Sequence, residues 1–201
     1  MTTVLRLGEE HVPEVTRVLC DAFYDYPVMR YVLGGHPDDY EGRLSTLIHF
    51  FVMARVLRNE ELLGTMDGAD LAATALVSYP GRGGPPAELL ALRDEVWDKL
   101  DSESRSRYQA FGRACAPFEV EVPHIHLNMI GVSRASQGSG LGRKLMDHVH
   151  LMSHGDASSQ GVTLTTEDPA NVPLYEHFGY RLVGYVTLSP TIGTWGFFRP
   201  D

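Results

Sequence analysis

The 201-residue sequence predicts a mixed α/β fold, in which one sheet carries helices on both of its faces. Three observations lead to this prediction. The N-terminal third has a short apolar strand followed by segments whose apolar residues recur at helical spacing. A hairpin is then expected around Asp67-Gly68, a favoured turn pair. From residue 124 onward, strand-favouring and helix-favouring segments follow one another in the order β-α-β-α-β-β.

The individual elements follow from this periodicity and from the residues that interrupt it. Helices are expected at about 9–23, 27–33, 37–57, 87–115, 139–154 and 170–178, and strands at about 3–7, 61–66, 71–79, 124–132, 161–166, 181–188 and 191–199. Asp25-Tyr26-Pro27 ends the first helix, Pro27 suits the first turn of the second, and Gly34-Gly35 ends that one.

The strongest interruption is PGRGGPP at residues 80–86, which precedes the helical stretch at 87–115. This stretch is interpreted as an insertion between two strands of one sheet. We therefore expect a single domain over residues 1–201, with a helical insert at about 81–118.

Composition excludes several classes of protein. The formal net charge of −9 disfavours binding to the phosphate backbone of nucleic acids. No apolar run approaches the roughly 18 residues that a membrane helix needs, and the N-terminus does not resemble a signal peptide. Two distant cysteines, Cys20 and Cys115, suit a reducing cytoplasm. The pair His124 and His126 has no third ligand at a suitable spacing, so we expect no metal site.

The most informative segment runs from Ile130 to Leu145, where an apolar strand is followed by a glycine-rich loop and a helix. Such a junction directs unpaired backbone N–H groups and the positive end of the helix dipole toward one point. These groups bind phosphate or pyrophosphate, and glycine allows the anion to approach the backbone closely. The loop has no GxxxxGK[ST] pattern and no GxSxG pattern, so it is neither a P-loop nor a nucleophile elbow.

Two motifs in order resemble those of the GNAT acetyltransferase superfamily. The pattern V-x-x-x-x-Q-x-x-G-x-G, from Val132 to Gly142, is similar to that superfamily's acyl-CoA-binding motif. Downstream, residues 165–180 resemble its second motif, with Asn171 and Tyr175 on a helix that ends at Gly179. The resemblance implies a mostly antiparallel sheet with helices on both faces and acetyl-CoA as the acyl donor. It is also compatible with a homodimer.

Within the superfamily, the C-terminal half resembles the puromycin N-acetyltransferase group. The similarity covers residues 120–200 well and 3–35 loosely, and includes Asn171-x-Pro-x-Tyr-Glu and the closing Thr194-Trp195. Thr165 differs from that group, where a glutamate is expected, and segment 80–118 matches nothing in it. Both differences concern the acceptor and not the coenzyme A thioester.

The resemblance also implies roles for particular residues. The backbone of Ile130 and Val132 would hydrogen-bond the pantetheine arm as an added strand, and Asn171 would hydrogen-bond the same arm. The pyrophosphate would be held by the backbone amides of Gln137, Gly138, Ser139, Gly140, Leu141, Gly142 and Arg143. Asn171 could alternatively cap the helix that begins after Asp168-Pro169.

Tyr175 is the expected catalytic acid, because a phenol is protonated at pH 7 and can protonate the departing thiolate. The alternative is a tyrosine packed in the core. An amine acceptor also requires a base, because an ammonium group cannot attack a thioester. His126 is a candidate base, in competition with His124, Glu119, Glu121 and Asp25, and the residues alone do not decide among them.

The sequence therefore predicts an N-acetyltransferase that moves an acetyl group from acetyl-CoA to an amine of a small molecule. Two alternatives stay open: a non-catalytic acyl-CoA-binding regulatory module, and an enzyme that acetylates protein or peptide amines. The acceptor cleft is expected between the Phe23–Tyr31 segment, with Tyr24, Tyr26 and Tyr31, and the Gly81–Cys115 part of the insert. These tyrosines could instead close the edge of the sheet.

Overall fold

The computed structural model describes residues 3–34, 38–81 and 83–201, and its centre is a seven-stranded sheet. The strand order is β1-β2-β3-β4-β5-β7-β6, and every neighbouring pair is antiparallel except β4 and β5. The strands are β1 (Val4–Leu7), β2 (Leu62–Asp67), β3 (Asp70–Ser78), β4 (Ile125–Val132), β5 (Gly161–Thr166), β6 (Arg181–Ser189) and β7 (Ile192–Pro200). The predicted fold class, with a mostly antiparallel sheet, is confirmed.

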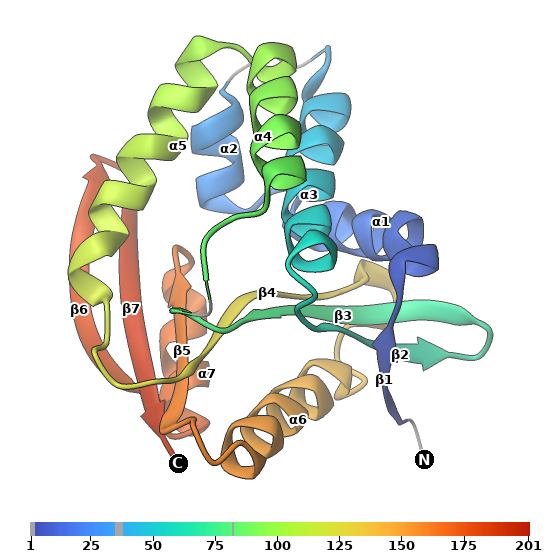
Figure 1. Ribbon diagram of the computed structural model, residues 1–201, viewed down its shortest axis with the longest axis vertical. Helices are drawn as coiled ribbons and strands as arrows, with labels where there is room; N and C mark the ends of the chain where they lie inside the picture. Colours follow the sequence, from blue (N-terminus) through green and yellow to red (C-terminus); the bar gives the residue numbers. More distant parts are fainter. Residues whose placement is uncertain (1–2, 35–37, 82) are drawn as a thin grey trace.

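Helices cover both faces of this sheet (Figure 1). One face carries α1 (Val12–Phe23), α2 (Pro27–Leu33), α3 (Tyr40–Leu57), α4 (Ala87–Leu100) and α5 (Ser102–Cys115). The other carries α6 (Leu141–Gly155) and α7 (Val172–His177). Short 3-10 turns lie at Glu9–His11, Ala116–Phe118, Arg134–Ser136 and Pro169–Asn171. Within the described ranges, no helix is both long enough and apolar enough to cross a lipid bilayer.

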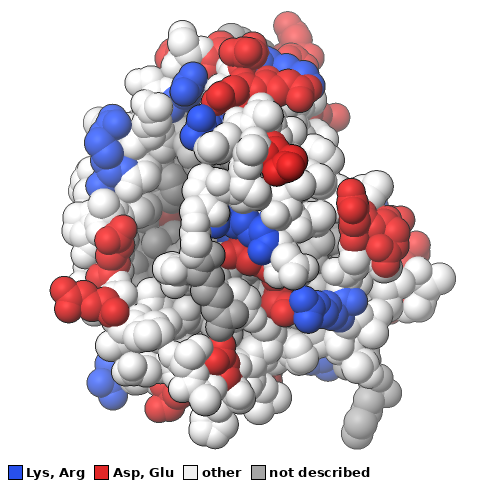
Figure 2. Space-filling model, viewed as in Figure 1, with Lys and Arg blue, Asp and Glu red and all other residues white. Residues whose placement is uncertain are grey.

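The surface carries the acidic charge that the composition predicts. Acidic groups are distributed around the outline of the face shown in Figure 2, where basic groups also lie near the centre. The same face is hollowed beside the segment that leads from β3 into α4 (Figure 2).

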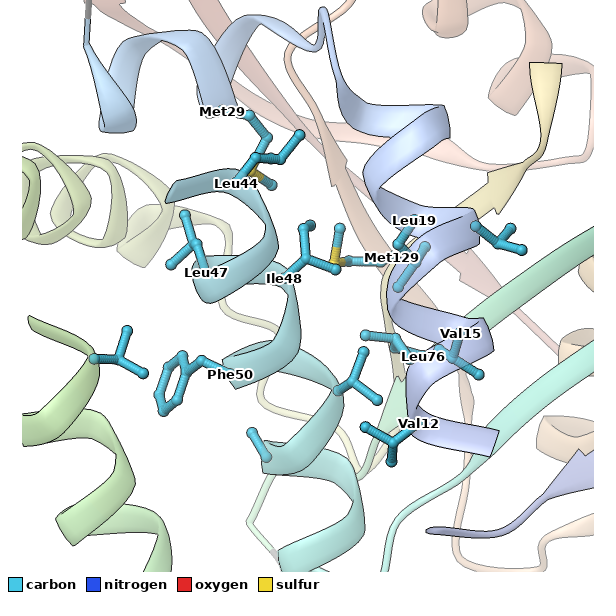
Figure 3. Close-up of a cluster of buried hydrophobic side chains, with 14 of the residues drawn as sticks. Val12, Val15, Leu19, Met29, Leu44, Leu47, Ile48, Phe50, Leu76 and Met129 are labelled. Atoms are coloured by element: carbon cyan, nitrogen blue, oxygen red, sulfur yellow. The ribbon is translucent and has the colours of Figure 1, made fainter. Parts of the chain in front are cut away.

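The main core lies between α1, α3 and the sheet (Figure 3). Leu19 of α1 and Ile48 of α3 are fully buried and point toward Met129 of β4. Apolar residues recur along α1 at helical spacing, so one face of this helix is buried. A second core on the opposite face joins α6 and α7 to the sheet and includes Leu145, Tyr175 and Phe197.

The helical stretch expected at 87–115 is in fact two helices, which meet at Asp101. This residue has a positive φ of 90°, and its carboxylate accepts a hydrogen bond of 2.7 Å from the backbone N–H of Ser104. It thereby caps the N-terminus of α5. The buried Arg43 of α3 donates hydrogen bonds of 2.7 Å to the Leu100 carbonyl and to the Asp101 carboxylate. The break was not predicted because Arg43 is distant in sequence. The start expected for α3 at Pro37 lies outside the described residues.

Candidate active site

The candidate site begins where β4 and β5 separate. These strands run parallel, and their register joins only Ile125 to Val162 and His126 to Thr163. Both strands continue beyond these pairs, β4 to Val132 and β5 to Thr166. The edge of β4 that faces β5 is therefore open from residue 127 onward, and this stretch includes the predicted Ile130 and Val132. An open strand edge can hydrogen-bond an extended ligand as if it were a further strand.

A pocket of about 860 Å³ lies at this opening. Strand β4 lines it with His126, Asn128 and Ile130, and the end of β5 leads into it through Glu167. Asn171 and Tyr175, from the segment that follows, also line it. The pocket thus brings together the predicted Ile130, His126, Asn171 and Tyr175.

The far wall of the pocket comes from the N-terminal helices and the insert. Tyr26 lines it together with residues of α2 and α3. From the insert, Leu89 of α4 and Phe111 of α5 line it as well. Tyr24 and Tyr31 do not line the pocket and pack against the main core instead. Of the three tyrosines considered for an acceptor cleft, only Tyr26 therefore reaches this space.

The glycine-rich loop before α6 has the geometry of an anion cradle. Gly138 and Gly140 have φ values of 78° and 79°, in the left-handed region that favours glycine. A Cβ atom at either position would meet no atom within 4 Å among the described residues, so the backbone faces open space. Gly140 is the N-cap of α6, a helix of 15 residues. The amides of Leu141, Gly142 and Arg143 belong to the first turn of α6, at the positive end of the helix dipole, and residues 137–140 lead directly into it.

The side chains of this loop take little part in the cradle. The Ser139 hydroxyl donates to the backbone carbonyl of Ser136, and Arg143 is exposed, with its Nε atom 3.9 Å from the Asp147 carboxylate. Leu141 is buried in the second core and anchors the first turn of α6. Phosphate binding here would accordingly depend on the backbone and on the absence of side chains at the glycines.

Tyr175 combines a packed ring with an available hydroxyl. Its ring packs against Tyr180 and Phe197, with centroids 5.8 and 5.9 Å apart, and the residue is only 8% exposed. Across the described part of the chain, no hydrogen bond engages this hydroxyl. Burial, reinforced by the negative charge of Glu167, raises the pKa of Tyr175 to about 12. The phenol therefore remains protonated near pH 7 and can act as a proton donor.

Asn171 lies in the turn before α7 and is half-buried. Its Nδ2 atom donates a hydrogen bond of 3.2 Å to the Thr166 hydroxyl. Asn171 is the N-cap residue of α7, but its side chain makes no capping hydrogen bond there, whereas Asp168 caps the preceding 3-10 turn by accepting 2.9 Å from the backbone N–H of Ala170. Asn171 thus remains beside the pocket with its carbonyl oxygen unused in this contact.

Glu167 is a titratable pocket residue that the sequence analysis missed. It is 5% exposed, and the Thr194 hydroxyl donates a hydrogen bond of 2.7 Å to its Oε1 atom. Burial raises the pKa of Glu167 from the ordinary 4.5 to about 7, despite the opposing hydrogen bonds from Thr194 and Tyr26. The group can therefore accept and release a proton near neutral pH. The available signal was a carboxylate inside the second motif, directly after the end of the strand.

Tyr26 connects the N-terminal segment to Glu167. Its hydroxyl lies 2.9 Å from the Thr166 hydroxyl and accepts a hydrogen bond of 3.0 Å from the backbone N–H of Glu167. Because these residues are about 140 positions apart, only the folded chain makes the contact. Tyr26 therefore helps to fix the end of β5 at the pocket.

His126 lies in the pocket but is a weaker candidate for the base. Its Nδ1 atom is 2.9 Å from the Thr163 hydroxyl. Burial, with the nearby His124 and Arg55, lowers the pKa of His126 to about 4. A base this weak removes a proton from an ammonium group less readily than Glu167 does.

The other candidate bases are placed less favourably. Asp25 is exposed and forms ion pairs of 2.8 Å with Arg30 and Arg134, which hold its pKa below the usual range. Glu119 is exposed at the pocket, whereas Glu121 does not line it. His124 lines the pocket, but its Nδ1 atom is 2.7 Å from the Val122 carbonyl.

The structure contains no group of three or more histidine, cysteine or carboxylate side chains that could hold a metal ion, in the part of the chain that it describes. Both cysteines are free thiols. Cys115 lines the pocket, with its sulfur 3.9 Å from the Thr194 hydroxyl, and burial raises the pKa of its thiol to about 11. It is therefore not a thiolate nucleophile near pH 7.

Comparison with known proteins gives three findings. The sequence model of the acetyltransferase (GNAT) domain family matches residues 103–182. An uncharacterised N-acetyltransferase of Schizosaccharomyces pombe is 27% identical over 186 residues, which cover 87% of this chain and 72% of that protein. Among solved structures, a Corynebacterium glutamicum protein described as histone acetyltransferase HPA2 and related acetyltransferase matches with a TM-score of 0.69 and 20% identity, over 100% of this chain and 97% of that one.

A polyamine N-acetyltransferase of Drosophila melanogaster, which forms N-acetylagmatine, matches with a TM-score of 0.65 and 16% identity, over the whole of both chains. At these identities the two structures establish the shared fold. The match at residues 103–182 includes the glycine loop, β5, Glu167 and Tyr175. These comparisons do not bear on the narrower likeness to the puromycin group, which stays a prediction.

Proposed function

We propose that this chain is an acetyltransferase of the GNAT type, whose family model matches residues 103–182, and that it transfers an acetyl group from acetyl-CoA to the amine of a small molecule. The observation that carries the proposal is one pocket in which an open strand edge, a proton donor and a proton acceptor meet. These three are β4 beyond His126, Tyr175 and Glu167. A molecule that only bound acyl-CoA would have no need of the last two.

The donor half of the site fits coenzyme A. The open edge of β4 can hydrogen-bond the amide groups of a pantetheine arm, and the loop from Gln137 to Arg143 can receive the pyrophosphate. Open space beside Gly138 and Gly140 leaves room for the phosphates, and Asn171 lies where it can hydrogen-bond the arm. A thioester bound in this way supplies the activated acetyl group.

Glu167 is proposed to deprotonate the acceptor. Alkylammonium groups have pKa values near roughly 10, so nearly all of an amine arrives protonated at pH 7. With its pKa at about 7, the Glu167 carboxylate is a stronger base than an ordinary glutamate and can remove this proton, directly or through a water molecule. The neutral amine then attacks the thioester carbonyl.

Tyr175 is proposed to protonate the sulfur as the carbon–sulfur bond breaks. Its phenol is neutral at pH 7 and has no competing hydrogen bond among the residues described. The amide product carries the nitrogen that attacked, and the second proton lost from that nitrogen can restore Tyr175 through water. Glu167 releases its proton to solvent before the next turnover.

The shape of the pocket supports a small acceptor. Helices α4 and α5 form one wall of the pocket, and its volume of about 860 Å³ lies within the range of small-molecule sites. The Drosophila protein with the same fold acetylates a small amine. A protein or peptide substrate would have to insert a side chain between Tyr26 and the insert.

The proposal is tested by incubating the purified chain with acetyl-CoA and a panel of primary amines while thiol release is monitored. Amine-dependent release, with the N-acetyl product identified by mass spectrometry, is the expected result. Binding of acetyl-CoA in calorimetry without transfer to any amine or peptide would instead indicate a non-catalytic binding module. Transfer to peptides alone would favour the protein or peptide alternative.

A further inference from the structure

The pocket carries more positive charge than a chain of net charge −9 would suggest. Arg55 and Arg58, at the C-terminal end of α3, and Arg93 of α4 all line it. The acidic residues that line it are Glu167 and the exposed Glu119. Figure 2 shows basic groups near the centre of this face, beside acidic ones.

Arg55 is a buried cation that keeps hydrogen-bonding capacity. Its side chain is 13% exposed, and its Nη1 atom lies 3.1 Å from the Glu60 carboxylate and donates 2.9 Å to the Asn128 side chain. Its Nε atom is buried without a hydrogen-bond partner in the described structure. Nε is enclosed and out of a ligand's reach, whereas Nη2 is not enclosed and makes no hydrogen bond among the described residues, so a ligand acceptor can pair with Nη2.

Arg58 is close to Arg55 and lacks a carboxylate of its own. It is half-buried, and no acidic group of the described ranges lies within ion-pair distance of its guanidinium. Its positive charge contributes to lowering the pKa of Arg55, after the larger effect of burial. Glu60 is thus paired with Arg55 alone, and Arg93 is paired with Asp94 of its own helix, which leaves the charge of Arg58 without an ion-pair partner among the described residues.

This arrangement is suited to an anion. Guanidinium groups bind carboxylates through parallel N–H donors in a fixed plane, and such charge-assisted bonds are stronger than neutral ones. The acidic surface as a whole repels anions, so the guanidinium groups would supply the local attraction that an anionic ligand needs. The free charge of Arg58 would also oppose the binding of a second cationic group.

We propose that the acceptor is an amine that also carries a carboxylate, held by Arg58 and Arg55 while its amine faces Glu167. The proposal rests on the proposed function and adds the substrate class to it. Asn128, which Arg55 contacts, lies on β4, whereas Glu167 follows β5, and these strands separate beyond His126 and Thr163. The two guanidinium groups and the Glu167 carboxylate therefore line the pocket from different elements. We accordingly place the amine and the carboxylate at separate ends of the acceptor, as in an ω-amino acid.

The test compares 6-aminohexanoate with hexylamine, which has a similar chain without the carboxylate, and with agmatine, which carries a second cation. The parent should prefer 6-aminohexanoate in kcat/KM. Replacing Arg58 by glutamine (Arg58→Gln) should reduce the ratio of 6-aminohexanoate to hexylamine by about 10- to 100-fold, the effect of losing a charged hydrogen bond. Arg58→Glu should shift the preference toward agmatine.

The matched control is Arg105→Gln, which makes the same change at an exposed arginine of α5 that does not line the pocket. This variant should keep the parental ratio. A thermal-shift titration without acetyl-CoA provides a readout independent of turnover. 6-Aminohexanoate should raise the melting temperature of the parent more than hexylamine does, and Arg58→Gln should remove this difference.

Failure of this inference can be distinguished from failure of the proposed function. If amines are acetylated but Arg58→Gln leaves the substrate ratio unchanged in a folded protein, the carboxylate subsite is refuted and the acetyltransferase proposal stands. If no amine is acetylated, the proposed function fails. In that case an Arg58-dependent thermal shift would support the subsite, and its absence would refute it.

Discussion

Replacing Glu167 by glutamine should lower activity and raise stability at the same time. The substitution keeps the shape of the side chain and an oxygen that can accept the 2.7 Å hydrogen bond from Thr194. It removes the ability to accept a proton, and a general base typically contributes about 10²- to 10⁴-fold in rate. We therefore expect kcat/KM of Glu167→Gln at pH 8 to fall by about 10²- to 10⁴-fold. This fall corresponds to a loss of roughly 3 to 5 kcal/mol of transition-state stabilisation.

The pH dependence of the parent follows from the same group. Tyr26, Tyr175 and Cys115 around Glu167 stay neutral near pH 7, because burial raises the pKa of each. Glu167, whose pKa is about 7, is the neighbour that titrates there. Activity should rise with pH as its proton is lost and should bend near pH 7. The bend should be absent from the variant.

The stability effect has a definite sign. The pKa of Glu167 is raised on folding from 4.5 to about 7, so the folded state holds its proton more tightly than the unfolded state does. This contribution is fully present below pH 4.5 and is lost as the pH rises through 7. The loss corresponds to about 3 kcal/mol, since each pKa unit is worth roughly 1.4 kcal/mol. Glutamine carries no charge, so the variant avoids this loss.

The assay combines urea unfolding with steady-state kinetics at pH 5 and pH 8.5. Relative to the parent, Glu167→Gln should gain free energy of unfolding at pH 8.5 and little at pH 5, while its activity falls. Glu121→Gln is the control, because it makes the same change at an exposed carboxylate that does not line the pocket. Undiminished activity of Glu167→Gln, when chemistry limits the rate, would refute the assignment of the base. An equal change in the free energy of unfolding at both pH values would refute the inference that Glu167 is a buried carboxylate with a raised pKa.

Three further predictions concern the donor site, the acid and the core. Tyr175→Phe keeps the packed ring and should reduce kcat by about 10²- to 10⁴-fold, with calorimetric affinity for acetyl-CoA nearly unchanged; an unaltered kcat would make Tyr175 a structural residue. Gly140→Asp adds bulk and negative charge at a positive-φ position beside the proposed pyrophosphate site, so acetyl-CoA should bind at least tenfold more weakly, and unchanged affinity in a folded variant would place the site elsewhere. Ile48→Ala, in the fully buried main core, should cost about 2–5 kcal/mol in urea unfolding, and a cost below 1 kcal/mol would contradict the packing described.

Local features of the candidate site could be predicted because their chemistry depends on neighbours in the chain. The glycines at 138 and 140 are required by the backbone conformation of their own loop, and α6 begins within a few residues of them. The placement of Tyr175 on a short helix after β5 likewise follows from adjacent residues. The break at Asp101 was missed because the arginine that stabilises it belongs to another helix.

The sequence by itself determined the order of the strands and of most helices along the chain and the glycine loop that precedes α6, and it singled out Tyr175 as the expected proton donor. These depend on short-range periodicity, on backbone conformation and on residue type. Only the tertiary structure decided that β4 and β5 separate after two residue pairs, because strand register depends on the packing of the whole sheet. It also decided the environment of Glu167, the proposed base, since burial and the distant Tyr26 and Thr194 determine the surroundings and the pKa of its carboxylate.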